Sequence, residues 1–272
     1  AAGAGNNRFF RDLTEDSEEF GADVFVPFEL GSRQATLKVG GVWLEGHRVY
    51  RERRFRWSRE ANTRDLIENY PNPVGIIDRT ENSVTYGNTI SDLPNNLVNL
   101  DGEQIVSAGY TQLDLQWAPE WRMIAGLRAE RTEISTAAAA GTPFRAADIN
   151  QTDLLPAFSV VHEVRPGMNL RAAYGRTLAR PLYRELADIR VEDAFNNEFF
   201  AGNPDLMLTT IDNFDVRWEW FPGANDVLAA SLFYKRFTDP IESITACGAI
   251  TPRNLESGEV KGIEFVARWN LG

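Results

Sequence analysis

The sequence predicts an all-β fold of antiparallel strands, and more specifically a segment of a transmembrane β-barrel. Apolar and polar side chains alternate along nine stretches of the chain, as they do in strands with one apolar and one polar face. The connections between these stretches alternate between a short turn and a long loop. That order is typical of outer-membrane barrels, which have short periplasmic turns and long extracellular loops.

The composition is compatible with a barrel and argues against several other classes of protein. No run in the 272 residues approaches the roughly 20 apolar residues that a membrane-spanning helix needs. A barrel strand needs only alternating apolar positions, so a mean hydropathy of -0.33 does not exclude it. The net charge of -11 argues against a nucleic-acid partner, because phosphate binding needs clustered positive charge.

No catalytic, metal or cofactor site is predicted. Cys247 is the only cysteine, and the only histidines, His47 and His162, are too far apart in sequence to suggest a metal site by spacing. Paired carboxylates such as Glu18 and Glu19 lie in a polar stretch without a histidine, nucleophile or metal partner. We therefore predict that the chain is not an enzyme and binds no cofactor.

The first two strands are expected at residues 20–29 and 34–57, after a polar and acidic loop over residues 1–19. A short turn through Gly31 and Ser32 joins them. The second stretch is unusually long and rich in arginine in its far half, so we expect it to project beyond the bilayer. These arginines are interpreted as a solvated extension or as a contact with lipopolysaccharide phosphate or an acidic ligand, since arginine forms bidentate bonds with such groups.

Residues 58–101 lack alternation, and we predict a long outer loop there. Alternation returns at residues 104–117 and, after a tight turn, at residues 121–134. In the latter stretch Arg128 and Glu130 lie on the face opposite the apolar residues. Placing such a charge toward lipid costs up to a few kcal/mol near the midplane, so charge fixes the register as much as apolarity does.

The second half of the chain repeats this arrangement. A loop is predicted over residues 136–151. Further strands are expected at residues 154–164, 168–177, 211–220, 226–237 and 257–270, with tight turns at Pro166 and Gly223 and loops over residues 178–205 and 238–256. The tight turns near Ser32, Pro119, Pro166 and Gly223 should lie at one end of the sheet, and the loops containing Pro73, Gly141, Asp193 and Cys247 at the other.

Alternation also assigns each side chain to one face of the sheet. We expect the following residues to face lipid: Leu113, Leu115, Phe214, Val216, Leu232, Ile263 and Phe265. Those expected to face inward are Asp114, Arg128, Asp215, Arg217, Glu264 and Arg268. Aromatic residues collect at membrane interfaces, where the ring lies at headgroup depth. The periplasmic girdle is assigned to Trp117, Trp121, Trp220, Phe221 and Trp269, and the outer girdle to Tyr110, Tyr174 and Tyr234.

Several sequence strings resemble those of a known family. They are GLRAER at 126–131, TLARP at 177–181 with YREL at 183–186, AGNPDL at 201–206, and NLESG at 254–258 with KGIE at 261–264. Together and in this order they resemble the barrel half of TonB-dependent receptors, from about residue 102 onward. The first hundred residues resemble the family in layout more than in letters.

The resemblance implies a receptor in the bacterial outer membrane that binds a scarce extracellular solute, such as an iron chelate, cobalamin or a carbohydrate, and imports it with energy supplied through TonB. It also implies a closed barrel of about 22 strands around an N-terminal plug. Residues 1–272 are therefore expected to be an internal segment of that barrel, with the plug and the barrel-closing strands absent. The implied partners are the extracellular ligand, the TonB complex through the missing N-terminal region, and outer-membrane lipid and lipopolysaccharide.

Other functions stay open on the residues alone. A passive porin or a surface adhesin barrel shares the strand pattern, but porins lack the strings around Arg180 and Asn203. A soluble β-sandwich or solenoid used for binding would have turns of similar length at both ends of the sheet. A plug sequence upstream in the gene would favour the transporter over the porin and the adhesin.

One cluster in the loop over residues 178–205 is predicted to contact ligand. Aromatic rings stack on planar groups and amides both donate and accept hydrogen bonds, which suits sugars or aryl chelates. The alternative is a loop that packs its own aromatic residues for rigidity. The cluster comprises Phe195, Asn196, Asn197, Phe199, Phe200 and Asn203.

Overall fold

The computed structural model describes residues 7–59, 79–81, 84–86, 88–92, 98–138, 144–193, 198–223, 225–246 and 248–269. The chain divides into two compact units. The smaller comprises Ala1–Glu15, Arg48–Asp101 and Ala138–Phe144, and the larger Asp16–His47, Gly102–Ala137 and Arg145–Gly272. Among the described residues, no helix has the length and apolar character needed to cross a membrane.

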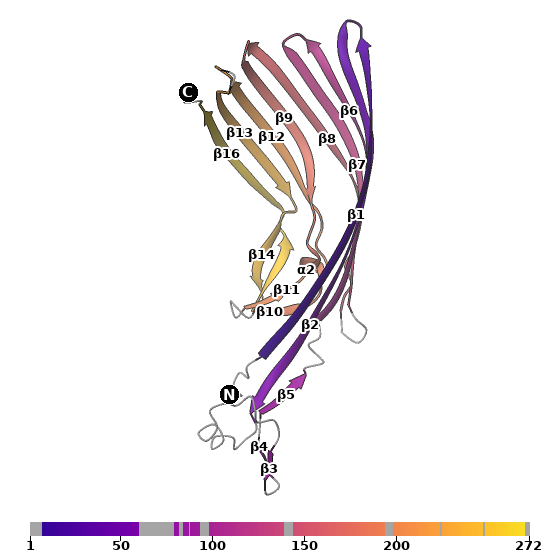
Figure 1. Ribbon diagram of the computed structural model, residues 1–272, viewed down its shortest axis with the longest axis vertical. Helices are drawn as coiled ribbons and strands as arrows, with labels where there is room; N and C mark the ends of the chain where they lie inside the picture. The colour runs from indigo at the N-terminus through magenta and orange to yellow at the C-terminus, as the bar shows by residue number, and fades with distance from the viewer. Residues whose placement is uncertain are drawn as a thin grey trace. The chain divides into compact units, whose positions relative to one another are not determined.

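Nine strands follow one another in a single antiparallel sheet (Figure 1). They are β1 (Asn7–Leu30), β2 (Arg33–Arg59), β6 (Val98–Ala118), β7 (Trp121–Ala138), β8 (Asp148–Arg165), β9 (Met168–Ala179), β12 (Thr209–Trp220), β13 (Val227–Thr238) and β16 (Ser257–Arg268). Their order in the sheet is their order in the sequence. The predicted fold class and all nine predicted strands are confirmed.

Several strands extend further from the tight turns than predicted. β1 begins at Asn7 rather than at residue 20, and β8 begins at Asp148 rather than at residue 154. The additional residues are mostly polar, and polar residues on both faces hide the period-two pattern on which the prediction relies. The predicted loops over residues 1–19 and 136–151 were therefore wrong in their bounds.

One face of the sheet exposes large apolar side chains. Phe214 is 46% exposed, Leu232 55%, Ile263 62% and Phe265 79%. The strand registers place such residues in rows, with Val216 opposite Leu232 and Leu232 opposite Ile263. A barrel presents an apolar surface of this kind to lipid. We call this the outward face, and the lipid-facing prediction is confirmed for these five residues.

The opposite face, which we call the inner face, carries charged side chains. Arg217 donates to Glu219 at 2.8 Å and to Ser231 at 2.9 Å, and Arg171 donates to Glu219 at 2.6 Å. By register Asp215, Glu264 and Arg268 share this face. Asp114 lies here as well, because it accepts hydrogen bonds from Arg122 at 2.9 and 2.5 Å, so strand periodicity places Leu113 and Leu115 on the outward side. Leu115 is only 8% exposed, so its predicted exposure to lipid is not confirmed.

The tight turns lie together at one end of the sheet, at the top of Figure 1. The Phe221 N–H donates to the Gly167 carbonyl at 2.8 Å, which joins the turn after β12 to the turn after β8. Gly167 has a φ of 76°, which a glycine adopts at little cost. The Arg33 guanidinium lies 3.9 Å from the centroid of the Trp117 ring, which brings the turn after β1 to the same end.

The turn after β6 joins them, since the Glu163 N–H donates to the Glu120 carbonyl at 2.8 Å. The predicted grouping of the four tight turns is thus confirmed. Of the positions expected in long loops, Asp193 ends a short strand between β9 and β12. Pro73, Gly141 and Cys247 lie outside the described residues.

A row of aromatic rings marks the far limit of the apolar belt. The Phe214 ring centroid lies 5.0 Å from that of Tyr174 and 6.1 Å from that of Tyr234, so the outer-girdle prediction is supported for both tyrosines. Tyr110 was assigned wrongly. It lies on the inner face, where its hydroxyl donates to Asp23 and the Arg128 guanidinium lies 5.8 Å from its ring centroid.

The physical reason for this error is strand periodicity. Tyr110 is an even number of residues from Asp114, and such residues share a face in a regular strand. On this side of the sheet the outward face carries Phe20 and Trp43 instead, with ring centroids 5.8 Å apart. At the end with the tight turns, Trp117 and Trp121 are 48% and 40% exposed, as expected for the periplasmic girdle.

The smaller unit contains structure where a loop was predicted. Within residues 58–101 the structure describes β3 (Arg79–Glu81), β4 (Val84–Tyr86) and β5 (Asn88–Asp92), with β3 paired to β4 and β5 paired to β2. Glu52 on β2 is fully buried and accepts hydrogen bonds from Arg11 at 2.7 Å and Tyr50 at 2.8 Å. Arg48 donates to Glu15 at 2.6 Å, so part of the arginine-rich half of β2 pairs with the chain itself.

Candidate functional site

Two of the predicted loops combine into a second sheet. Its order is β10-β11-β15-β14, from β10 (Arg190–Asp193), β11 (Glu198–Ala201), β14 (Ile241–Ala246) and β15 (Ala249–Asn254). β11 and β15 come from different loops and run parallel, with Phe200 opposite Ile250. Together with the short helix α2 (Tyr183–Leu186), the described residues within 180–208 and 239–256 form what we call the loop sheet. Both segments were predicted only as long loops, and the strands within them were not predicted.

The loop sheet has a small apolar core of its own. Leu186 and Ala187 are fully buried, and Leu206, Leu208 and Ala249 are 3–5% exposed. These residues come from both loops, so neither loop could bury them alone. No periodic pattern in the sequence marks this core, because its members are spread singly over segments that contain many polar residues.

Side chains fasten the two loops to each other. The Asn203 amide donates to the Pro252 carbonyl at 3.1 Å, and its oxygen accepts from the Asp205 N–H at 3.0 Å. Beside it, Gly202 lies so close to Ala187 that a Cβ would overlap the Ala187 carbonyl oxygen. The string AGNPDL therefore has a structural role in closing this sheet.

Asn254 makes a second fastening. Its side-chain oxygen accepts from the Met207 N–H at 2.9 Å, and its amide donates to the carbonyls of Met207 at 3.1 Å and Asp239 at 2.7 Å. Asp239 has a φ of 54°, an uncommon conformation for a residue other than glycine. Its carbonyl also accepts from the Thr209 hydroxyl at 2.9 Å. The string that begins at Asn254 thus joins both loops to each other next to Thr209, the first residue of β12.

An ion pair with a buried carboxylate anchors the loop sheet to the inner face of the nine-stranded sheet, which we call the wall. Arg180 donates to Glu130 on β7, and its Nε lies 3.3 Å from the Thr132 hydroxyl. Glu130 is only 5% exposed, and it also pairs with Arg128 at 2.5 Å. A carboxylate buried to this extent needs such partners, because an unpaired buried charge is costly. The strings GLRAER and TLARP meet in this pair.

Tyr183 forms a second anchor. It is 9% exposed, its hydroxyl donates to the Gly46 carbonyl at 3.1 Å, and a Cβ on Gly102 would lie 2.8 Å from its Cε1. Gly102 therefore provides the space that the tyrosine ring occupies. Helix α2 is short and rests on contacts of this kind rather than on helix propensity.

Arg145, from the connection after β7, binds the loop sheet from another side. Its guanidinium lies 2.5 Å from the Asp205 carboxylate, and its backbone N–H donates to Asp188 at 3.1 Å. The hydrogen bond to Asp205 raises the pKa of Arg145 above its ordinary value, so this residue stays cationic. Three separate connections therefore meet at the loop sheet.

The predicted ligand cluster is only partly described. Phe195, Asn196 and Asn197 lie outside the described residues. The Phe199 ring is 37% exposed and has the Arg190 guanidinium 4.4 Å from its centroid. The Phe200 ring has the Arg184 guanidinium 4.2 Å from its centroid, and the two phenylalanines point to opposite faces of β11. The Asn203 amide is engaged with Pro252.

A groove of about 720 Å³, lined by apolar residues such as Val106 and Leu155 as well as by polar ones, lies on the inner face of the larger unit. We call it the polar groove after its hydrogen-bonding members. Its lining includes Gln104, Tyr110, Gln112, Arg128, Glu130 and Arg180. The charges are mostly paired, because Arg128 and Arg180 both bind Glu130. Within the described part of the chain, the side-chain amides of Gln104 and Gln112 make no hydrogen bond. The groove thus offers uncharged hydrogen-bonding groups to a solute. Sequence reasoning missed it, since its members come from six different strands.

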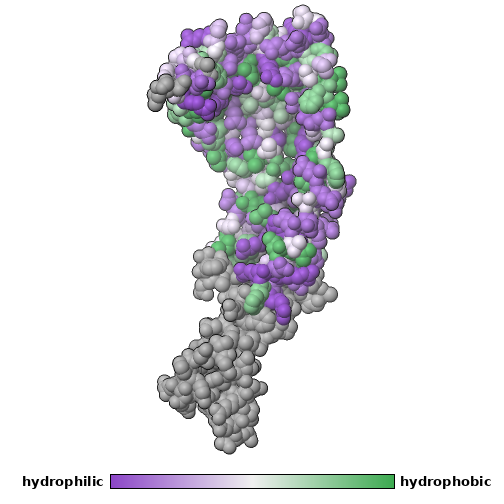
Figure 2. Space-filling model, in the orientation of Figure 1, coloured by the Kyte–Doolittle hydropathy of each residue, from purple (hydrophilic) through white to green (hydrophobic). Residues whose placement is uncertain are grey.

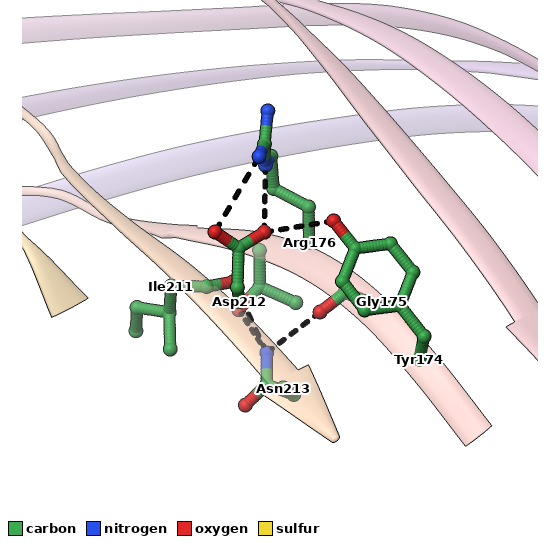
Figure 3. A network of polar contacts seen from close by, with 7 residues as sticks. Tyr174, Gly175, Arg176, Ile211, Asp212 and Asn213 are labelled. Atoms are coloured by element: carbon green, nitrogen blue, oxygen red, sulfur yellow. Dashed lines mark hydrogen bonds and ion pairs between the residues drawn. The ribbon is translucent and has the colours of Figure 1, made fainter. Parts of the chain in front are cut away.

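A further polar network lies where the apolar belt ends (Figure 3). Asp212 accepts from Arg176 at 2.9 Å and from the Tyr174 hydroxyl at 2.8 Å. Asn213 points to the other face of β12 and donates to the Gly175 carbonyl at 3.0 Å. Charged residues thus replace apolar ones on the outward face beyond the aromatic row. Over the face drawn in Figure 2, hydrophilic and hydrophobic residues are interspersed.

The family described as TonB dependent receptor-like, beta-barrel, matches residues 2–272. The chain belongs to the TonB-dependent receptor family. It is therefore an outer-membrane protein, as predicted, and its family is one of receptors and transporters rather than enzymes. A search of curated protein sequences gave no match.

Solved structures of TonB-dependent receptors share the fold of this chain. The ferric citrate transporter FecA in its unliganded form matches with a TM-score of 0.67 and 13% identity, over 96% of this chain and 33% of that chain. The alcaligin outer-membrane receptor FauA from Bordetella pertussis matches with a TM-score of 0.58 and 12% identity, over 97% and 37%. The copper transporter OprC matches with a TM-score of 0.55 and 15% identity, over 96% and 37%. The chain thus spans about a third of the length of these receptors.

Proposed function

We propose that the receptor containing this chain binds a scarce extracellular solute and imports it to the periplasm with energy supplied through TonB. The observation that carries this proposal is the loop sheet, which is anchored by Arg180 and Tyr183 to the inner face of the wall, beside the polar groove. The solved receptors of similar fold include proteins named for ferric citrate, alcaligin and copper, which supports a metal or a metal chelate as the solute. Cobalamin and carbohydrates are the other classes to test.

The proposal concerns the whole receptor, of which we propose that residues 1–272 form part of the barrel. The solved receptors are about three times as long as the region matched here, which supports a larger barrel that holds these nine strands. The proposed partners are the extracellular solute, the TonB complex, and the outer-membrane lipid and lipopolysaccharide around the outward face.

Uptake measurements test the proposed transport directly. We would compare a strain with and without the gene for accumulation of ferric citrate, hydroxamate and catecholate chelates of iron, copper, cobalamin and oligosaccharides. We expect one class to depend on the gene and on a functional TonB. Gene-dependent uptake that continues without TonB would replace this proposal with a passive porin, and the absence of any gene-dependent uptake would favour an adhesin.

Ligand contact is proposed for the exposed side of the cluster that contains Phe199. Phe199 has a half-exposed ring beside Arg190, which suits an aryl or anionic group of a chelate. Because Phe200 faces the other side of β11, the two residues can be tested separately. We expect Phe199→Ala in the full receptor to weaken solute binding several-fold, measured by titration of the purified receptor.

The matched control is Leu255→Ala, which removes a similarly exposed apolar side chain at the end of β15. Equal solute affinity for Phe199→Ala and the unmodified receptor, with both proteins folded, would remove this face from the binding site. Phe200→Ala is expected to reduce resistance of the loop sheet to protease, because Phe200 pairs with β15 and stacks against Arg184.

A further inference from the structure

The outward face contains a hollow of about 560 Å³ over β1, β2 and β6. Small residues form its floor, and two aromatic rings stand at one side. The lining residues are Phe20, Gly21, Ala22, Gly41, Val42, Trp43, Ser107, Ala108 and Gly109. None of these described lining residues carries a charge, so the hollow suits an apolar occupant rather than an anionic headgroup.

Strand periodicity places this hollow on the side that faces lipid. Lys38 pairs with Asp23 at 3.1 Å, and Asp23 accepts from Tyr110, which together lie on the inner face. Gly41 and Gly109 each lie an odd number of residues from Lys38 and Tyr110 on their strands, and therefore belong to the outward face. The hollow is separate from the polar groove described above, although both are lined by Val42.

The hollow exists because glycine and other small residues occupy its floor, where larger side chains would fill the space. No heavy atom of a described residue lies within 4 Å of the position that a Cβ on Gly109 would take. One side of the hollow is formed by the rings of Phe20, which is 64% exposed, and Trp43, whose centroids lie 5.8 Å apart. Elsewhere on the outward face, large side chains such as Leu232 and Ile263 fill the corresponding positions.

The depth of the hollow follows from the length of a membrane-spanning strand. A tilted strand crosses the hydrocarbon core in about 9–11 residues. Phe20 and Trp43 lie roughly that far along β1 and β2 from the turn at Gly31, which is at the periplasmic end. The hollow is therefore at the level of the outer leaflet, with its two rings at the depth where aromatic side chains meet headgroups.

We propose that this hollow binds one acyl chain of an outer-leaflet lipid. An empty hollow in hydrocarbon would forfeit the dispersion contacts of the atoms that line it, and a chain of methylene groups restores them. The hollow is continuous with the lipid-facing surface, so acyl chains reach it without crossing any polar layer. The bulky rings of Phe20 and Trp43 hold the chain at its headgroup end. This lipid site is independent of the transported solute.

Photolabelling of the full receptor tests the site. The receptor would be reconstituted in phosphatidylethanolamine and phosphatidylglycerol vesicles that contain a phospholipid with a diazirine in one acyl chain. After illumination, labelled peptides are mapped by mass spectrometry. We expect labelling around residues 20–22, 41–43 and 107–109 to exceed several-fold the labelling around Ile263, which faces the same lipid from a filled surface.

Three variants distinguish the hollow from general lipid contact. Gly109→Phe fills open space and should lower labelling at the hollow several-fold, whereas Gly109→Ala leaves most of the space and should retain it. Ala230→Phe adds the same ring elsewhere on the outward face, opposite Trp218 and Phe265, and should leave labelling at the hollow unchanged. Migration of the unheated protein on a gel verifies that each variant is folded.

Labelling at the hollow no stronger than around Ile263 would overturn the proposal. The same holds if Gly109→Phe and Ala230→Phe have equal effects. A disulfide that joins two receptor copies through a Gly41→Cys substitution would identify the occupant as a second copy and would also overturn the proposal. None of these results depends on which solute the receptor transports.

Discussion

The barrel wall and the loop sheet are both antiparallel for the most part, yet different forces specify them. In the wall, residues of one strand alternate between the lipid-facing side and the inner face, as Val216 and Arg217 do. The facing of each strand is therefore determined by its own sequence. In the loop sheet, the parallel contact between β11 and β15 and the bonds of Asn203 and Asn254 join segments far apart in sequence. The wall is thus specified locally and the loop sheet by a few long-range contacts.

The largest loss of stability is expected when a charged residue is placed on the outward face of the wall. Val216→Arg places a charge on the outward face, opposite Leu232, and should lower the free energy of unfolding by about 2–4 kcal/mol if the residue lies near the midplane. Ala173→Arg is the matched control, because it places the same side chain on the inner face opposite Asp215. Urea unfolding of the receptor in vesicles measures both. Equal losses for the two variants would refute the facing of β12.

The second largest loss of stability is expected from removing the ion pair between Arg180 and Glu130, which anchors the loop sheet to the wall. Arg180→Met leaves the buried Glu130 with Arg128 as its remaining described cation, and should cost roughly 3 kcal/mol in the stability of the anchored loop sheet. Adding Glu130→Gln should recover part of this loss, since it removes the uncompensated charge. Limited proteolysis of the receptor in urea measures the local stability. Strictly additive losses in the double variant would show that the two residues are not coupled.

Gly202 tests the packing of the loop sheet alone. Gly202→Ala forces a Cβ against the Ala187 carbonyl and should destabilise the loop sheet by roughly 1–3 kcal/mol, with faster protease cleavage between β9 and β12. Gly175→Ala is the control, because a Cβ there meets open space on the wall. The wall should assemble normally in both variants. If Gly175→Ala is the more harmful change, the assigned crowding at Gly202 is wrong.

The smallest effects are expected from replacing one asparagine in each region, which compares the wall and the loop sheet directly. Asn254→Ala removes three hydrogen bonds that join separate segments, and should cost the loop sheet about 1–2 kcal/mol. Asn213→Ala also removes three side-chain bonds, but β12 keeps its ladders to β9 and β13, so a smaller loss is expected. Hydrogen exchange of Met207 and of residues in β12 would report the two losses separately.

The wall could be predicted from sequence because its signal repeats every two residues. All nine strands, the tight turns and the facing of Arg217 and Val216 followed from that period. The error at Tyr110 came from treating a tyrosine near a strand end as a girdle residue without applying the same period. Strand ends were too short in the prediction because polar residues occupy both faces beyond the membrane, for example at the start of β1.

The loop sheet could not be predicted because its order comes from contacts without a local period. In the sequence, Asn203 and Asn254 cannot be distinguished from ordinary loop residues. Their roles become clear only from their hydrogen bonds to the backbone of Pro252 and Met207 in the structure. Four of the strings that carry the family resemblance, GLRAER, TLARP, AGNPDL and NLESG, contribute contacts that hold or anchor the loop sheet, whereas the predicted ligand residue Phe199 stays a prediction. A buried acid such as Glu130 gives one usable signal, since a charge at an inner strand position requires a partner from another segment.

The central claim is that residues 180–208 and 239–256 fold as one sheet rather than as two separate loops. A disulfide between positions 200 and 250 tests it, using F200C and I250C in a receptor whose Cys247 is replaced by serine. The control pairs F200C with S243C, which lies on β14 and is not adjacent to β11. We expect rapid and nearly complete cross-linking of the first pair at the cell surface and little of the control. Cross-linking of the first pair no faster than that of the control would contradict the account.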